Sequence, residues 1–248
     1  MIVLDAPAKL TWYLEVTGRR ANGYHELRSE MTTLALGDQL TLDETGDYVR
    51  VVDHVGRPVP EGDDNLVAAA LALVGRRAGV LIDKSIPAGG GLGGGSADAA
   101  AILRWAGGVE ASRALSLGGD VPFCQVGGRA LVEGVGERVS PLPFERRTVT
   151  LFIPDFGVST PECYRAYDEL YESGWRPTGS NHLEEPARRV EPRLATALDW
   201  LRARFDDVRL AGSGSTMFVE GSVGDALDVD GPAMRLRVVT TTTTPAGA

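Results

Sequence analysis

Lysine is scarce in this 248-residue sequence: only Lys9 and Lys84 occur among 25 basic residues, and the others are arginines. We expect the two lysines to lie where a compact ammonium is needed and a planar guanidinium cannot replace it. The net charge is −9, and this acidity argues against a nucleic-acid partner, because nucleic-acid binders present a basic face. An acidic chain can still bind a phosphorylated ligand through backbone N–H groups and a few well-placed cations.

Cysteine is also scarce, and long apolar runs are absent from the sequence. The two cysteines, Cys124 and Cys163, cannot form a disulfide framework, and no Cys/His cluster indicates a zinc site. No run of about 18 apolar residues suggests a membrane span. The first residues show neither a basic segment nor the apolar segment of a signal peptide. We therefore expect a cytoplasmic protein with no metal ligands of its own and no membrane partner.

The length suits one large domain or two small ones, and the pattern of apolar residues mixes strands with helices. Short alternating runs broken by glycine predict strands and turns over residues 1–60. Further strands are expected at 80–86, 130–132, 138–140, 148–153 and 217–219. Helices are expected at 66–74, 97–106, 110–117, 161–172 and 193–205. A domain boundary is placed near residue 147, and residues 240–248 are expected to be a frayed tail.

Six glycines occupy the seven positions from Gly89 to Gly95, between a predicted strand and a predicted helix. Glycine loses much conformational entropy on folding, so this use implies a close approach of the backbone to a bulky group. The N–H groups of such a loop converge with the N-terminus of the next helix, a geometry that binds phosphate. Ser96 is expected to cap that helix and to offer its hydroxyl to a phosphate oxygen or its metal.

Three other interpretations of this glycine loop are weaker. A flexible linker would carry polar residues and join domains, whereas this loop lies between an apolar strand and an amphipathic helix. A P-loop needs a Gly-Lys-Ser/Thr sequence, and the loop contains no lysine. A dinucleotide-binding GxGxxG pattern can be read at Gly89, Gly91 and Gly94, but any glycine-rich run would match it. The acidic residue of that motif would be Glu110 or Asp120, and both are loosely placed.

The loop and two further segments resemble the galactokinase, homoserine kinase and mevalonate kinase superfamily. The matching segments are residues 7–10, 87–101 and 212–216. Within it, the chain is most similar to the family of 4-diphosphocytidyl-2-C-methyl-D-erythritol kinases, of the non-mevalonate isoprenoid pathway. This likeness is carried by residues 6–10, 23–27, 64–66, 84–87, 119–123, 134–137, 157–160 and 180–181. The pair Tyr24-His25 is the most telling, because other superfamily members lack it.

The resemblance implies a two-lobed α+β small-molecule kinase fold. Residues 1–147 would form an ATP-binding domain like the second domain of a small-subunit ribosomal protein. Residues 148–248 would form a ferredoxin-like substrate domain. The enzyme would transfer the γ-phosphoryl of ATP to a hydroxyl of the methylerythritol moiety, giving the 2-phosphate, with Mg²⁺ arriving with ATP. Its partners would be ATP and this cytidine-diphosphate-linked sugar alcohol, and the protein would be a monomer or a homodimer.

Lys9 and Asp120 match the catalytic pair of the family. Asp120 would accept the proton of the attacking hydroxyl or orient that hydroxyl, and Lys9 would offset negative charge at the transferring phosphoryl. Taken alone, Asp120 is typical of a turn aspartate and Lys9 of a surface lysine. The position of Lys9 inside an apolar strand favours the functional interpretation.

The resemblance also assigns binding residues. ATP would be bound by Asn65, Lys84, Pro87, Ala88, Gly89, Gly90, Gly91, Leu92, Gly93, Gly94, Gly95, Ser96 and Ala97. The acceptor would be bound by Thr11, Tyr24, His25, Asp120, Thr160, Gly212, Ser213 and Gly214, with Tyr24 stacked on cytosine and His25 bonded to its edge. Each of three residues also has a simpler interpretation without ligand binding. Asn65 and Thr160 would cap helices, and Lys84 would be a surface lysine.

The chain departs from the family pattern at two positions and in one segment. Thr11 replaces a common asparagine, and His182 replaces a common aspartate. Residues 220–236 lack the pattern of a helix that the family usually has. Two alternatives to the leading hypothesis were weighed. One is a superfamily kinase of the homoserine or mevalonate type, which has no cytosine to hold. The other is a non-catalytic ligand-binding pseudokinase, which loss of Lys9 or Asp120 would have indicated, and both residues are present.

Overall fold

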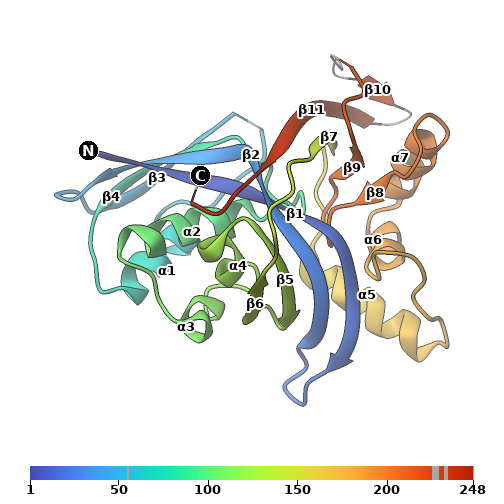
Figure 1. Ribbon diagram of the computed structural model, residues 1–248, viewed down its shortest axis with the longest axis horizontal. Helices are drawn as coiled ribbons and strands as arrows, with labels where there is room; N and C mark the ends of the chain where they lie inside the picture. The colour runs from blue at the N-terminus through green and yellow to red at the C-terminus, as the bar shows by residue number, and fades with distance from the viewer. Residues whose placement is uncertain (55, 225–228, 232–233, 248) are drawn as a thin grey trace.

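The computed structural model describes residues 1–54, 56–224, 229–231 and 234–247. A long antiparallel hairpin of β1 (Ile2–Arg19) and β2 (His25–Asp43) runs through the middle of the molecule (Figure 1). One group of helices, α1 to α4, lies to one side of this hairpin, and α5 to α7 lie to the other. The sequence prediction of a mixed α+β chain is therefore confirmed.

The sheet is built around β2, which pairs with four other strands. The strand order is β3-β4-β2-β11-β7-β9-β8, with β1 and β5 also paired to β2, β6 to β5, and β10 to β11. The strands besides the hairpin are β3 (Tyr48–Asp53), β4 (Gly79–Lys84), β5 (Arg129–Gly134), β6 (Arg138–Pro141), β7 (Thr148–Pro154), β8 (Arg209–Leu210), β9 (Met217–Glu220), β10 (Val229–Gly231) and β11 (Met234–Thr244).

The helices pack on this sheet through short apolar side chains. They are η1 (Gly62–Asp64), α1 (Leu66–Leu73), α2 (Gly94–Trp105), α3 (Ala111–Leu115), α4 (Val121–Val126), α5 (Thr160–Glu172), α6 (Glu184–Val190) and α7 (Pro192–Arg202). Helix α2 buries a run of alanines, residues 99–101, together with Ile102 and Leu103. Alanine side chains let α2 pack closely on β1, which brings the glycine loop at its N-terminus next to that strand. Among the described residues, no helix is long and apolar enough to cross a bilayer.

Two sequence predictions about helix starts are corrected. Helix α2 begins at Gly94 rather than at residue 97, because Gly93 is its N-cap, in a left-handed conformation with φ of +69°. Ser96 therefore lies inside the first turn and does not cap the helix. Helix α5 begins at Thr160 with Ser159 as the N-cap, and neither residue caps it through its side chain. The sequence also gave no sign of α4 or α6.

The predicted frayed tail is wrong for residues 240–244. These residues belong to β11, which pairs with β7 and, at Thr243 and Thr244, with β2. A run of β-branched threonines suits a strand, and their hydroxyls are used as well: Leu36 N donates to Thr241 Oγ1 at 3.1 Å. Part of the segment 220–236 lies outside the described residues, at 225–228 and 232–233; the described remainder contributes to β9, β10 and β11.

The structure contains two groups of buried apolar side chains. One lies between the sheet and α1, α2 and α4, and the other lies among α5, α6, α7 and the strands of the chain's second half. Their membership crosses residue 147, since Val149 and Leu151 pack in the first group and Leu14 packs in the second. The domain division at 147 stays a prediction.

Candidate active site

A cleft of about 1290 Å³ opens between the two groups of helices. Its walls come from the tip of the β1–β2 hairpin, the start of α1, the glycine loop, the turn before α4, and α5. The predicted site residues that line it are Lys9, Tyr24, His25, Asn65, Lys84, Pro87, Ala88, Gly89, Gly90, Gly91, Gly93, Gly94, Gly95, Ser96, Asp120, Thr160, Gly212 and Ser213. Thr11, Leu92, Ala97 and Gly214 are not among the lining residues.

Lys9 and Asp120 form an ion pair at the floor of this cleft. The Lys9 Nζ lies 3.2 Å from Asp120 Oδ2, and the lysine side chain is 6% exposed against 33% for the aspartate. The surface interpretation of Lys9 is therefore wrong. The backbone N–H of Lys9 donates to Leu92 O at 3.0 Å, so the glycine loop is attached directly to the strand that carries this lysine.

The Asp120 carboxylate is not used to cap its own helix. Asp120 occupies the N-cap position of α4, but its side chain makes no capping hydrogen bond. The turn that carries it is tightly packed, because a Cβ atom on Gly136 would lie 2.0 Å from Gly119 O. The segment 134–137 thus packs against the backbone of the turn that carries Asp120, and the carboxylate contacts Lys9.

Thr11 lies two residues after Lys9 on β1 and accepts a hydrogen bond from Lys9 Nζ at 3.2 Å. It is 1% exposed, so its hydroxyl contacts the lysine rather than the open cleft. Gly212, with φ of +60°, also lies next to the Lys9 ammonium, since a Cβ atom on it would be 3.5 Å from Lys9 Nζ. The threonine that departs from the family pattern therefore helps to position Lys9.

The glycine loop packs against a second glycine loop, residues 211–216. A Cβ atom on Gly91 would lie 2.1 Å from Ala211 O, and one on Gly214 would lie 2.0 Å from Gly91 N. Thr216 N also donates to Gly90 O at 3.1 Å. Gly214 is required by this loop-to-loop contact. Leu92 and Ala97 face the apolar core, where both are fully buried.

Arg57 holds the glycine loop from outside and was not predicted from sequence. Its guanidinium donates to Ala88 O at 2.5 Å, to Phe156 O at 2.6 Å, and to Pro154 O. Burial lowers the pKa of Arg57, against the opposing effect of the Asp155 and Asp53 carboxylates. The irregular segment around residue 57 carries no sequence pattern that could have indicated this role.

Lys84 is 2% exposed, which contradicts its interpretation as a surface residue. Its Nζ lies 2.7 Å from Asp98 Oδ2 and also contacts Asp38. Although burial opposes it, the two carboxylates raise the pKa of Lys84. Asp38 Oδ1 in turn accepts from Ser85 N at 2.6 Å and Ile86 N at 2.8 Å, so the cluster anchors the chain where β4 leads into the glycine loop. A direct contact of Lys84 with ATP stays a prediction.

Asn65 caps α1, as the simpler interpretation expected. Its Oδ1 accepts from Val67 N at 2.9 Å and its Nδ2 donates to Pro60 O at 2.7 Å. Thr160 does not cap α5 and instead shares a hydrogen bond with Ser213 at 2.9 Å between hydroxyl oxygens. That bond joins α5 to the second glycine loop at the rim of the cleft.

An aromatic corner of the cleft lies where the β1–β2 hairpin meets α5. The His25 ring stacks on Tyr164, with centroids 4.8 Å apart and planes 18° apart. Its Nε2 lies 2.7 Å from Asp168 Oδ1. Tyr24 is 65% exposed beside it, so one face of an aromatic ring is available to a ligand. Tyr164 and Asp168 were not predicted from sequence. Thr160, Tyr164 and Asp168 follow one another at intervals of four residues, which places all three on one face of α5.

His182 and its neighbour Asn181 support the site from the second half of the chain. Val16 N donates to His182 Nδ1 at 3.0 Å, so the histidine accepts from β1. Asn181 Nδ2 donates to Gly212 O at 2.8 Å and to Leu210 O at 3.0 Å. Together they tie the second glycine loop to the β1–β2 hairpin.

Comparisons with known proteins agree with this geometry. Residues 65–128 match the model of the GHMP kinases N terminal domain. The 4-diphosphocytidyl-2-C-methyl-D-erythritol kinase of Delftia acidovorans is 39% identical over 246 residues, covering 87% of this chain and 85% of its own length. The chain belongs to the 4-diphosphocytidyl-2-C-methyl-D-erythritol kinase family.

Solved structures support the assignment to the 4-diphosphocytidyl-2-C-methyl-D-erythritol kinase family. A crystal structure of 4-(cytidine 5'-diphospho)-2C-methyl-D-erythritol kinase matches with a TM-score of 0.71 and 32% identity, covering 100% of both chains. A mevalonate kinase structure matches with a TM-score of 0.56 and 13% identity, covering 98% of this chain and 99% of its own, and so shares the fold alone. The expected α+β small-molecule kinase fold is confirmed.

Proposed function

We propose that this protein transfers the γ-phosphoryl group of ATP to a hydroxyl of the methylerythritol moiety of 4-diphosphocytidyl-2-C-methyl-D-erythritol, giving the 2-phosphate. The observation that carries the proposal is the Lys9–Asp120 pair, 3.2 Å apart, in a cleft that the glycine loop and the aromatic corner also line. Relatives of this name support the identity of the acceptor. The activity serves the non-mevalonate route to isoprenoid precursors.

The residues at the floor of the cleft suit phosphoryl transfer. The acceptor oxygen forms the new bond to γ-phosphorus while the bond to the bridging oxygen of ADP breaks. Asp120 orients the attacking hydroxyl and takes its proton. Lys9 offsets charge on the transferring group, and its own position is held by Thr11 and by Gly212.

The nucleotide phosphates lie on the glycine loop in this proposal. The loop leads into α2, so its backbone N–H groups and the first turn of that helix point toward one place. Lys84 does not supply a free charge there, because two carboxylates already contact its ammonium. Lys9, which lies against the glycine loop through its backbone bond to Leu92 O, supplies an ammonium beside that loop in this proposal.

A magnesium ion fits this arrangement as a companion of ATP. Among the described residues no group of three or more His, Cys, Asp or Glu side chains forms a metal site. Mg²⁺ commonly keeps its waters and binds through phosphates and one or two protein oxygens. Ser96, which lines the cleft and faces the turn of Asp120, and Asp120 itself would hold it. When bound, the ion neutralises charge on the β- and γ-phosphates.

The aromatic corner favours a cytidyl acceptor over the acceptors of other superfamily members. Tyr24 offers a stacking face, and His25 and Tyr164 form the wall beside it. A homoserine or mevalonate acceptor has no base to stack there. Both cysteines are free and buried, which is consistent with the cytoplasmic site of action that we propose. Whether the protein is a monomer or a homodimer stays a prediction.

Release of ADP from ATP, measured with four acceptors, tests the function. We expect turnover with 4-diphosphocytidyl-2-C-methyl-D-erythritol and none above background with mevalonate, homoserine or galactose. Asp120→Asn should lower that turnover by about 10²–10⁴-fold, because it removes the proton acceptor, while ATP binding measured by calorimetry persists.

Three results would argue otherwise. Preferred turnover of mevalonate or homoserine would assign a different superfamily activity. ATP binding without turnover of any acceptor would indicate a binding protein. Near-normal turnover by Asp120→Asn would remove the assigned role of that carboxylate.

A further inference from the structure

Asp168 reaches from α5 to the β1–β2 hairpin and contacts two of its side chains. Its Oδ1 lies 2.7 Å from His25 Nε2, and its Oδ2 lies 3.4 Å from Arg19 Nη2. Because the two partners use different oxygens, the carboxylate is held against rotation about its own axis. One side chain of the second half of the chain thereby fixes the ring of His25 at the cleft.

The His25 ring has little freedom apart from the position of its hydrogens. It stacks on Tyr164 on one side and meets the edge of Tyr167, with centroids 5.7 Å apart and an interplanar angle of 81°. Its side chain is 9% exposed. The ring therefore cannot turn over to exchange its two nitrogens without breaking both aromatic contacts and the contact with Asp168.

The contact with Asp168 decides which ring nitrogen carries the hydrogen. A carboxylate oxygen can only accept, so His25 Nε2 donates. In a neutral ring, the other nitrogen, Nδ1, is then an acceptor. Among the described residues no hydrogen bond to Nδ1 is found, and His25 lines the cleft, so we take this lone pair to be open to a ligand there.

We propose that Asp168 is a positioning residue that fixes this tautomer of His25 and thereby makes the site select cytosine over uracil. The inference rests on the proposed function, which places a cytidine diphosphate moiety in the cleft. Cytosine carries an exocyclic amino donor where uracil carries a carbonyl acceptor. The Nδ1 lone pair pairs with the amino group but faces the uracil oxygen without a hydrogen between them, which leaves both acceptors unsatisfied.

A purely structural role for Asp168 predicts different results. In that case it would only attach α5 to the hairpin, and any change would alter stability without changing the choice of base. Asp168→Asn keeps the size of the side chain but can present either an oxygen or an amino group to His25, so the tautomer is no longer fixed. Arg19→Met removes the ion pair to Oδ2 and the hydrogen bond to Gly23 O, and keeps the contact between Asp168 and His25. Glu169→Gln alters the adjacent exposed residue, which pairs with Arg189, and is the matched control.

Calorimetric binding of cytidine 5'-diphosphate and uridine 5'-diphosphate to the whole protein measures selectivity without turnover. We expect the wild type, Arg19→Met and Glu169→Gln to bind the cytidine compound more tightly by at least about tenfold. Asp168→Asn should bring the two affinities within about twofold of each other. Equal selectivity in wild type and Asp168→Asn would overturn the proposal alone. No preference in the wild type would overturn it together with the cytidyl specificity of the proposed function.

The tautomer itself can be observed by nitrogen-15 NMR of the wild type, so the proposal does not depend on a variant that folds. The chain has 3 histidines, which makes assignment of the ring nitrogens practical. We expect His25 to show a protonated Nε2 and an unprotonated Nδ1. A hydrogen on Nδ1, with or without one on Nε2, would overturn the proposal.

Discussion

Asp98 shares a buried cluster with Lys84 and Asp38 beneath the glycine loop. Burial raises the pKa of Asp98 from an ordinary value of 3.8 to about 7, and the nearby Asp38 carboxylate adds to the effect against the pull of Lys84. Its Oδ1 has no hydrogen-bond partner among the described residues. Two carboxylates and one ammonium leave one negative charge in excess, so a proton on Asp98 makes the cluster neutral.

We predict that Asp98→Asn changes how stability depends on pH. Between its ordinary range near 4 and about 7, Asp98 binds its proton more tightly in the folded chain, so wild-type stability falls as the pH rises through this window. Asparagine does not titrate. The melting temperature of the variant should therefore rise relative to wild type over this window, by about 2–4 °C per kcal/mol.

Thermal melts of both proteins at several pH values check this. Asp47→Asn, at an exposed aspartate paired with Arg77, is the control and should follow the wild type at each pH. A constant difference between Asp98→Asn and wild type from acid to neutral pH would show that Asp98 does not titrate in this window.

Among the elements, the glycine loop depends on contacts made from outside it. Arg57 donates to Ala88 O at its start, and the same guanidinium reaches Pro154 and Phe156 at the end of β7. These carbonyls belong to segments far apart in sequence. Removing the guanidinium takes a donor away from each of these carbonyls, although Phe156 O still accepts from Ser215 Oγ at 2.7 Å. Each carbonyl left without a donor costs about 1–3 kcal/mol.

We predict that Arg57→Met raises the KM for ATP by about tenfold and changes the KM for the acceptor by less than about twofold. The physical reason is that the start of the loop loses its fixed position while the aromatic corner is untouched. Steady-state kinetics with each substrate varied in turn measures both values. Arg50→Met, at an exposed position of β3, is the control. Equal rises in both KM values would mean that Arg57 supports the whole cleft rather than the loop.

The elements differ in how far sequence alone could predict them. The glycine loop and α1 with its Asn65 cap follow from local patterns, and the structure bears them out. The short runs expected over residues 1–60 instead join into the long strands β1 and β2, because pairing across the hairpin carries each strand through its glycines. Helix α4 could not be predicted, because its six residues after Asp120 show no helical period. The catalytic pairing of Lys9 with Asp120 was predictable only by resemblance to a family. Arg57, Tyr164 and Asp168 act through contacts between distant segments, which no local pattern encodes.

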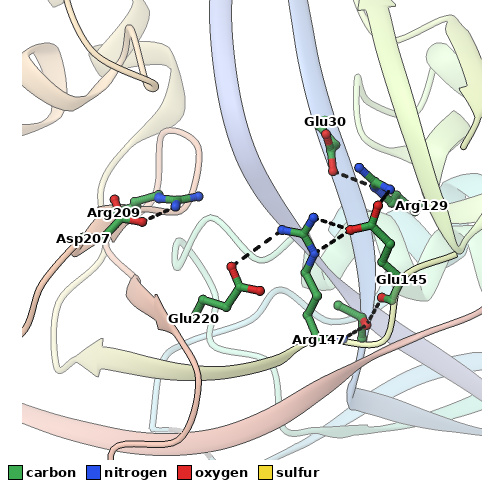
Figure 2. A network of polar contacts seen from close by, with 8 residues as sticks. Glu30, Arg129, Glu145, Arg147, Asp207, Arg209 and Glu220 are labelled. Carbon is green, nitrogen blue, oxygen red and sulfur yellow. Dashed lines mark hydrogen bonds and ion pairs between the residues drawn. The ribbon is translucent and has the colours of Figure 1, made fainter. Parts of the chain in front are cut away.

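On the scale of the whole molecule, a network of charged side chains joins the two halves of the chain near residue 147. Figure 2 shows Arg147 pointing toward Glu145 and Glu220, with Arg129 between Glu145 and Glu30. Arg129 Nε lies 2.7 Å from Glu30 Oε1. The Arg147 guanidinium also lies 4.6 Å from the ring centroid of buried Trp12. The network thus connects β2, β5 and β9 at the place where the chain passes from one half to the other.

We predict that Arg147→Met lowers the melting temperature by about 2–4 °C at low salt, because it removes two ion pairs and the cation–π contact with Trp12. In about 1 M salt the loss should shrink, since screening weakens the ion pairs of the wild type. Arg77→Met, which removes only the exposed pair with Asp47, should leave the melting temperature unchanged. An equal loss at both salt concentrations would attribute the effect to packing on Trp12 alone.

The contact between the two glycine loops has a thermodynamic consequence. No Cβ atom fits at Gly91 or Gly214, and Thr216 N is bonded to Gly90 O, so the loops shift together or not at all. In the proposed function one loop holds ATP, and the other lies beside Lys9 and the acceptor. This backbone contact then provides a route for a free energy of coupling between the two ligands. It acts with the same factor in both directions: whatever ATP does to the affinity for the acceptor, the acceptor does to the affinity for ATP.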